Sequence, residues 1–237
     1  MTSTAVLVFA RCAGFVARAP GIAHPSVGAP LRAGLALLLA GAIVPGVPPA
    51  RAPLDALLVP ALALEVLVGA AIGTAASLVY DAAYAGGRAI DDYVGVKAIA
   101  PSLQLVAPSG FGRVWSLAYT GAFFLLGAYR IAIPAFADSF VRVPVASPAG
   151  AYAWTQFGAG LAETMVAAGI AVAGPSIGVA FVVQLALGSL SRAVPRFGST
   201  TLAFPLVFAA ALVTTALTAS SLSQAAIAPE HALPARR

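Results

Sequence analysis

Three charged residues inside apolar segments are the places in this sequence where chemistry is conceivable. Glu65 and Glu163 each lie within a long apolar segment, and Arg11 interrupts the first one. A charged group at the centre of a membrane helix costs about 2.5–3.5 kcal/mol on insertion scales, so it usually faces protein or a wet cavity. The three residues are therefore either ion-pair anchors between helices or chains, or relays for protons or ions. One glutamate per helix, without a carboxylate cluster, favours anchors.

Familiar catalytic and metal-binding patterns are absent from the sequence. The two histidines, His24 and His231, lie in proline-flanked loops far from any carboxylate of an apolar segment. A serine nucleophile on one helix needs a base on a facing helix, and no apolar segment carries a histidine. No HExxH, CxxC or GxxxxGK[ST] motif occurs. The single cysteine, Cys12, excludes an internal disulfide and any multi-cysteine metal site. We expect no enzymatic activity, no cofactor and no metal.

The composition is that of a protein in contact with lipid. Of 237 residues, 60% are hydrophobic and only 9% are charged, against about 45–50% apolar and about 25% charged in soluble domains. Such a chain cannot cover its own surface with polar groups. Apart from Lys97, the basic residues are arginines, scattered singly except for the adjacent Arg236 and Arg237. Without a basic stripe and interleaved aromatics, nucleic-acid binding is not expected.

Six apolar segments organise the chain. They are residues 3–18, 31–47, 54–80, 113–136, 157–188 and 200–227. Several reach the ~20 residues that cross a hydrocarbon core. In lipid, backbone groups must be hydrogen-bonded within the segment, and the alternation of a barrel is absent, so helices are predicted. We expect one all-α integral membrane domain over 1–237, with its six helical segments arranged as hairpins. Its first helix is retained, and a short polar tail covers 228–237.

The stretch "DSFVRVPV" at 138–145 interrupts two very apolar parts of the chain. Pro144, and Pro148 just beyond the stretch, predict the end of a helix and a corner, because proline fixes φ and lacks a donor. Asp138 and Ser139 are suited to satisfying backbone groups at that corner. Phe140 is expected to pack beside it. The interruption is therefore predicted to be a corner rather than a catalytic site.

Small residues recur along the apolar segments. Gly69 and Gly73 have the GxxxG spacing that lets helix backbones approach closely, and 158–174 is similar. Packing within the chain is the simplest interpretation. The stretch 64–73 also resembles 162–171 faintly. Glycine-interrupted helices and a faint repeat are compatible with a small secondary transporter of a solute or ion, which is the alternative function.

The most polar long stretch is residues 80–101. Tyr80, Tyr84, Arg88 and Asp92 recur every four residues and so share one helix face. Arg88 and Asp92 are placed to pair across that turn. The stretch is either a solvated amphipathic helix or a gate element that meets other chains.

Five stretches, in order, resemble the FliR/SctT family of type III secretion export gates, from about residue 6 to residue 225. The stretches are "FARCAGFVARAPGIAHPSVGAPLRAGLALLLAGAIVP", "LEVLVGAAIG", "AGGRAIDDYVG", "DSFVRVPV" and "LALGSLSRAVP". Together with Glu163 they supply the candidate structural and assembly residues. These are Arg11, Arg32, Glu65, Gly69, Gly73, Gly87, Asp91, Gly95, Ser139, Phe140, Pro144, Glu163, Arg192 and Pro195.

The resemblance implies a function that composition does not. Members assemble in the bacterial inner membrane with R-type (FliP-like) and S-type (FliQ-like) subunits, joined by the U-type (FlhB-like) protein. Unfolded proteins pass through that gate, in a flagellar basal body or an injectisome base. The resemblance also implies that Arg11 and Glu65 are polar anchors between helices or subunits. The chain departs from the family pattern at Arg196, Gly198 and Val207, so flagellar or injectisome membership stays open.

Overall fold

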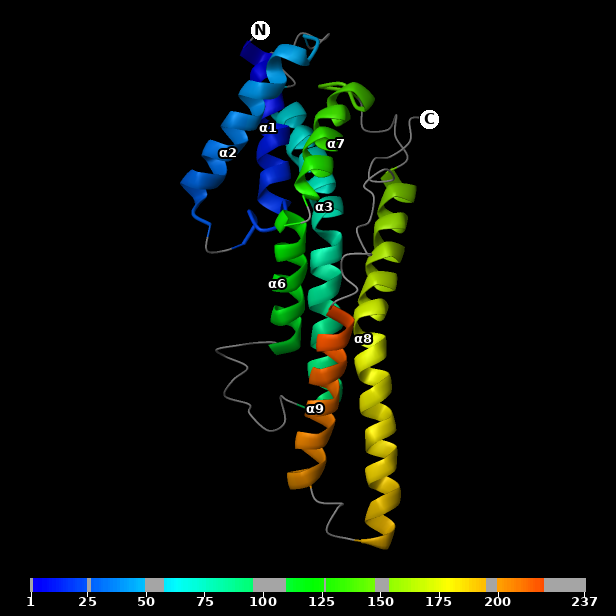
Figure 1. The fold of residues 1–237 in the computed structure, drawn as a ribbon. Helices are drawn as coiled ribbons and strands as arrows, with labels where there is room; N and C mark the ends of the chain where they lie inside the picture. The colour runs from blue at the N-terminus through cyan, green and yellow to red at the C-terminus, as the bar shows by residue number, and fades with distance from the viewer. Residues whose placement is uncertain are drawn as a thin grey trace. The chain divides into compact units, whose positions relative to one another are not determined.

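The protein is helical throughout its described part (Figure 1). The computed structural model describes residues 2–24, 27–49, 58–95, 110–125, 127–147, 154–194 and 200–219. These residues form helices and turns and contain no strand. The all-α fold class is therefore confirmed.

Seven α-helices and one 3₁₀ turn are present in the described part of the chain. They are α1 (Thr2–Arg18), α2 (Ala29–Ile43), η1 (Val44–Gly46), α3 (Leu58–Val94), α6 (Gly110–Leu125), α7 (Tyr129–Arg142), α8 (Trp154–Ala193) and α9 (Thr200–Ala219). Three stretches are long and apolar enough to cross a membrane, namely 29–46, 58–94 and 154–193. Counting α6 and α7 as one broken span gives four. Six apolar helical segments were expected, but only three or four stretches of the described chain are long and apolar enough to span a membrane.

Two expected boundaries are wrong. Helix α3 does not stop at Tyr80 but continues to Val94, through the polar stretch, because no proline interrupts it there. The apolar segment 113–136 is broken near Gly127, whose φ is +75°. Glycine adopts this left-handed conformation without the steric cost that a side chain brings. The Arg130 amide donates to the Gly127 carbonyl at 2.9 Å and helps start the next helix.

The predicted corner begins later than expected. Helix α7 ends at Arg142, so Asp138, Ser139 and Phe140 lie in its last turns rather than in the corner. The corner itself is the turn that follows, from Val143 to Ser147. The helix continues past Asp138 because its inner face, with Phe136 and Phe140, is buried.

The chain divides into two compact units, each with its own core. Unit 1 comprises residues 1–78, 123–162 and 227–237, and unit 2 comprises 79–122 and 163–226. Helices α3 and α8 contribute to both. The single domain expected over 1–237 stays a prediction.

In unit 1, α1 lies against α2, α7 and the first part of α3 (Figure 1). Phe15 and Phe136 stack there with ring centroids 4.2 Å apart. Cys12 is fully buried in the same core. The apolar contacts therefore hold α1 and α7 together around a common centre.

Unit 2 is built around close helix contacts that glycine permits. A Cβ on Gly87 would collide with the backbone of Phe111 and Gly112 on α6. A Cβ on Gly86 would lie 2.7 Å from the carbonyl oxygen of Gly169 on α8. The two adjacent glycines thus let the second part of α3 pack closely against two helices.

Asp91 caps a neighbouring helix in unit 2. Asp91 is 2% exposed, and its two carboxylate oxygens accept the Phe111 amide at 3.3 and 3.2 Å. That amide belongs to the first turn of α6, where N–H groups lack intrahelical partners and a negative charge is favourable.

Removing this cap is expected to loosen α6. Asp91→Ala should lower the free energy of unfolding by about 1–2 kcal/mol, the range of a lost helix cap. Asp91→Asn should cost less, because its amide oxygen still accepts a hydrogen bond. Hydrogen exchange of the first α6 amides measures this directly. Equal exchange in Asp91→Ala and the wild type would contradict the cap.

Candidate functional site

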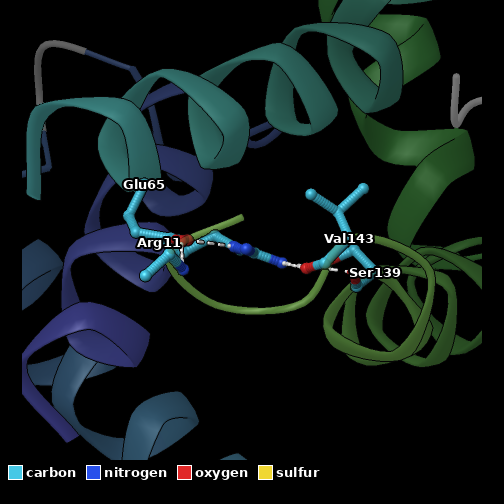
Figure 2. Close-up of polar contacts among 5 residues, drawn as sticks. Arg11, Glu65, Ser139 and Val143 are labelled. Atoms are coloured by element: carbon cyan, nitrogen blue, oxygen red, sulfur yellow. Dashed lines mark hydrogen bonds and ion pairs between the residues drawn. The ribbon is translucent and has the colours of Figure 1, made fainter. Parts of the chain in front are cut away.

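A buried ion pair links α1 to α3. Arg11 is completely buried, and its Nε donates to Glu65 Oε2 at 2.5 Å. Arg11 Nη1 also donates to the carbonyl oxygens of Ser139 at 3.1 Å and Val143 at 2.8 Å (Figure 2). One guanidinium therefore joins three segments that are far apart in the sequence. We call these four residues, with Ala146 and Phe140, the Arg11 cluster.

Arg11 lies at the C-terminal end of α7, where it donates to the Val143 carbonyl and adds a second donor to the Ser139 carbonyl, which already accepts the Val143 amide at 2.8 Å. The last carbonyls of a helix lack intrahelical donors, and cations are favourable near them. Arg11 supplies both a donor and a positive charge at this end, and its Cζ lies 4.4 Å from the Phe140 ring centroid. The guanidinium thus forms a cation–π contact as well as hydrogen bonds.

Glu65 holds the corner after α7. Its Oε1 accepts the Ala146 amide at 2.9 Å, while its Oε2 accepts from Arg11. Ala146 has a φ of +60°, a left-handed value that is uncommon outside glycine. The Ser147 amide closes the turn onto the Pro144 carbonyl at 3.2 Å. A strained residue of this kind persists only where its surroundings fix it, and the carboxylate does so here.

Because Ala146 is left-handed, two substitutions at this position should change the free energy of unfolding in opposite directions. Ala146→Gly should leave the free energy of unfolding unchanged or raise it by up to about 1 kcal/mol, because glycine removes the left-handed penalty. Ala146→Val should lower it by about 1–3 kcal/mol, because a β-branched residue is strained at this φ. Thermal unfolding of both variants in one detergent tests the prediction. A more stable Val variant would contradict it.

Three glycines bring Arg11 and Glu65 together. A Cβ on Gly69 would collide with the Arg11 carbonyl oxygen, and one on Gly14 would collide with the Val66 carbonyl oxygen. A Cβ on Gly73 would lie 2.7 Å from the Phe15 carbonyl oxygen. The GxxxG spacing of α3 is therefore used for packing against α1 within the chain.

The Ser139 side chain was expected to satisfy backbone groups at the corner, and it does not. Its hydroxyl is buried without a hydrogen-bond partner in the described part of the chain, and so is Arg11 Nη2. Ser139 contributes its backbone carbonyl instead, because that carbonyl faces Arg11. Pro144, also expected at the corner, is exposed.

The remaining candidate residues lie apart from the Arg11 cluster. Arg32 Nη2 donates to the His24 carbonyl at 3.1 Å. Gly95 ends α3 with a φ of +81°, its amide donating to the Asp91 carbonyl at 3.1 Å. Glu163 and Arg192 are exposed on α8. Pro195 lies outside the described residues.

Two further features were not anticipated. No ion pair joins Arg88 to Asp92 in the described part of the chain, although both residues are exposed on α3. Val143 and Ala146 contribute to the Arg11 cluster through backbone atoms. Any residue type can contribute backbone atoms, so the sequence did not single out Val143 or Ala146. Only the neighbouring proline, Pro144, indicated the corner.

Chemically, the Arg11 cluster is a buried, hydrogen-bonded ion pair. It contains no nucleophile next to a general base, the pairing that covalent catalysis requires. The described residues contain no group of three His, Cys, Asp or Glu side chains able to hold a metal ion. The arrangement fits positioning of helices.

The chain was compared with models of protein families and with curated proteins. The sequence profile described as "Bacterial export proteins, family 1" matches residues 2–228, nearly the whole chain. No curated protein matches the chain significantly.

Proposed function

Since the chain belongs to the FliR/SctT family of bacterial export proteins, we propose that it builds the export channel of a type III secretion system together with R-type (FliP-like) and S-type (FliQ-like) subunits. Family membership makes it a membrane-embedded component of a bacterial type III export apparatus. The proposal adds the channel, its substrates, which are unfolded proteins, and contact with the U-type (FlhB-like) protein. It also adds the place, the inner membrane within a flagellar basal body or an injectisome base.

The family match over residues 2–228 carries this proposal. The exposed surface of the long helices supports it. On α8, Val166, Ile170, Val182 and Leu185 are each more than half exposed. Large apolar side chains exposed in such numbers indicate contact with lipid or with other proteins. A channel subunit needs both.

The lengths of α3 and α8 also support an assembly that reaches beyond the bilayer. They contain 37 and 40 residues, which at 1.5 Å per residue is roughly 55 and 60 Å. The hydrocarbon core is only ~30 Å thick, and helices tilt by ~40° at most. Part of each helix therefore extends past the core at either end, where its apolar side chains need protein partners.

The Arg11 cluster is proposed to act in assembly. By joining α1, α3 and α7, it gives the first unit a fixed shape on which other subunits can be placed. We propose no catalytic role for the chain, because the Arg11 cluster offers hydrogen bonds and charge but no reacting group.

The test is purification of the tagged chain from its native membranes in mild detergent, followed by mass spectrometry. We expect R-type and S-type subunits in one stable complex at a fixed ratio. A monodisperse chain that is stable without partners and binds a small solute would contradict the channel and favour the secondary transporter.

A further inference from the structure

One face of α8 carries small residues and a carboxylate and is exposed in the described part of the chain. Glu163, Ala167, Ala171, Gly174 and Gly178 follow one another at steps of four, four, three and four residues, so they share one side of the helix. All five are exposed. We call them the Glu163 face.

The opposite side of α8 makes the contacts within unit 2. Val172, Ala173, Ser176 and Ala180 are buried there, and Ser176 Oγ lies 3.2 Å from Thr215 Oγ1 of α9. The Glu163 face is therefore not the packing side of this helix. A Cβ added at Gly174 or Gly178 would meet nothing within 4 Å. Packing among the described residues therefore does not require glycine at either position, although glycine weakens a helix relative to alanine.

On α3, the same pattern of a glutamate and two small residues binds another helix of the chain. On α3, Glu65, Gly69 and Gly73 have the spacing of Glu163, Ala167 and Ala171. There the small residues let α1 approach to backbone contact, and the carboxylate pairs with an arginine of the docked helix. The Glu163 face presents the same sequence of groups without a docked helix, and Glu163 has no ion-pair partner in the described part of the chain.

From this parallel we propose that the Glu163 face docks an apolar helix of another export-apparatus subunit, and that an arginine or lysine of that helix pairs with Glu163. The inference rests on the proposed function, because it names where such a subunit binds. Charge complementarity specifies the occupant: a carboxylate on an apolar face is costly against lipid tails, whereas a basic side chain compensates it. The α1 helix of a second copy of this chain does not fit, since its Arg11 is completely buried and already paired with the Glu65 of its own α3.

Cross-linking from the Glu163 face identifies the occupant. A cysteine at Ala171 is labelled with a photoactivatable maleimide in native membranes, where the native Cys12 is fully buried. We expect adducts with a peptide of an apparatus subunit that forms an apolar helix and carries a basic residue within about two turns of the cross-link. Adducts with lipid alone, or with a second copy of the chain, would overturn the proposal.

Substitutions that need no label give a second measurement. Glu163→Gln should reduce the co-purified subunit by roughly 3- to 20-fold, the effect of one interhelical polar contact in a membrane. Gly178→Leu should reduce it as well, by blocking close approach. Gly158→Leu is the matched control, because Gly158 is also exposed and open on α8 but lies on the other side of the helix.

The outcomes separate the two proposals. If the wild-type chain retains its export subunits and all three variants retain them equally, the docking proposal is wrong while the proposed function stands. If the wild-type chain co-purifies with no export subunit, the proposed function fails and the docking proposal fails with it.

Discussion

Glu65→Ala is expected to lower the free energy of unfolding by about 3–5 kcal/mol, the cost of leaving one buried charge without its partner. Arg11 is completely buried, and Glu65 is its only carboxylate partner in the described part of the chain. The same substitution removes the acceptor of the Ala146 amide. The loss should therefore exceed that of an ordinary hydrogen bond, about 0.5–1.5 kcal/mol.

Thermal or denaturant unfolding of the purified chain in one detergent measures this effect. Glu163→Ala is the matched control, because it removes the same carboxylate from an exposed position, and its stability should stay near that of the wild type. The double variant Arg11→Met/Glu65→Leu removes both charges and should recover part of the loss. Together with the single variants Arg11→Met and Glu65→Leu it closes a double-mutant cycle that reports the coupling. Equal stability of Glu65→Ala and Glu163→Ala would show that the pair is not an anchor.

The second large effect is expected at Gly69. Gly69→Ala places a Cβ against the Arg11 carbonyl oxygen, a backbone atom that cannot rotate away. Helix α1 must then shift from α3, which also separates Arg11 from Glu65. We expect a loss of about 3 kcal/mol, the upper part of the range for inserting atoms into a packed contact.

Gly34→Ala is the control for this substitution. Gly34 lies on α2 in the same unit, and a Cβ there meets nothing within 4 Å. Alanine should stabilise that helix by up to about 1 kcal/mol. Relative to the wild type, the unfolding midpoint should therefore fall in Gly69→Ala and rise in Gly34→Ala. A stabilised Gly69→Ala would contradict the close approach of α1 and α3.

Hydropathy predicted most helices because it is a local property. The bounds of the apolar segments 3–18 and 31–47 nearly match those of α1 and of α2 with η1. The segment 157–188 falls within the residues of α8. The break at Gly127 was missed, since a glycine in an apolar run is compatible with a continuous helix. Glycine permits its φ of +75° but does not require it. The continuity of α3 past Tyr80 was missed because polarity alone does not end a helix.

The sequence alone identified Arg11 and Glu65 as unusual, because charges in apolar segments are costly wherever the helices lie. It did not determine that they pair across 54 residues. It also did not separate Glu65 from Glu163, which stand before small residues at the same spacing. Tertiary structure decided both points. Gly14 and Gly69 let α1 approach α3 closely enough to bury one carboxylate on an arginine, whereas no helix of the described chain covers the other.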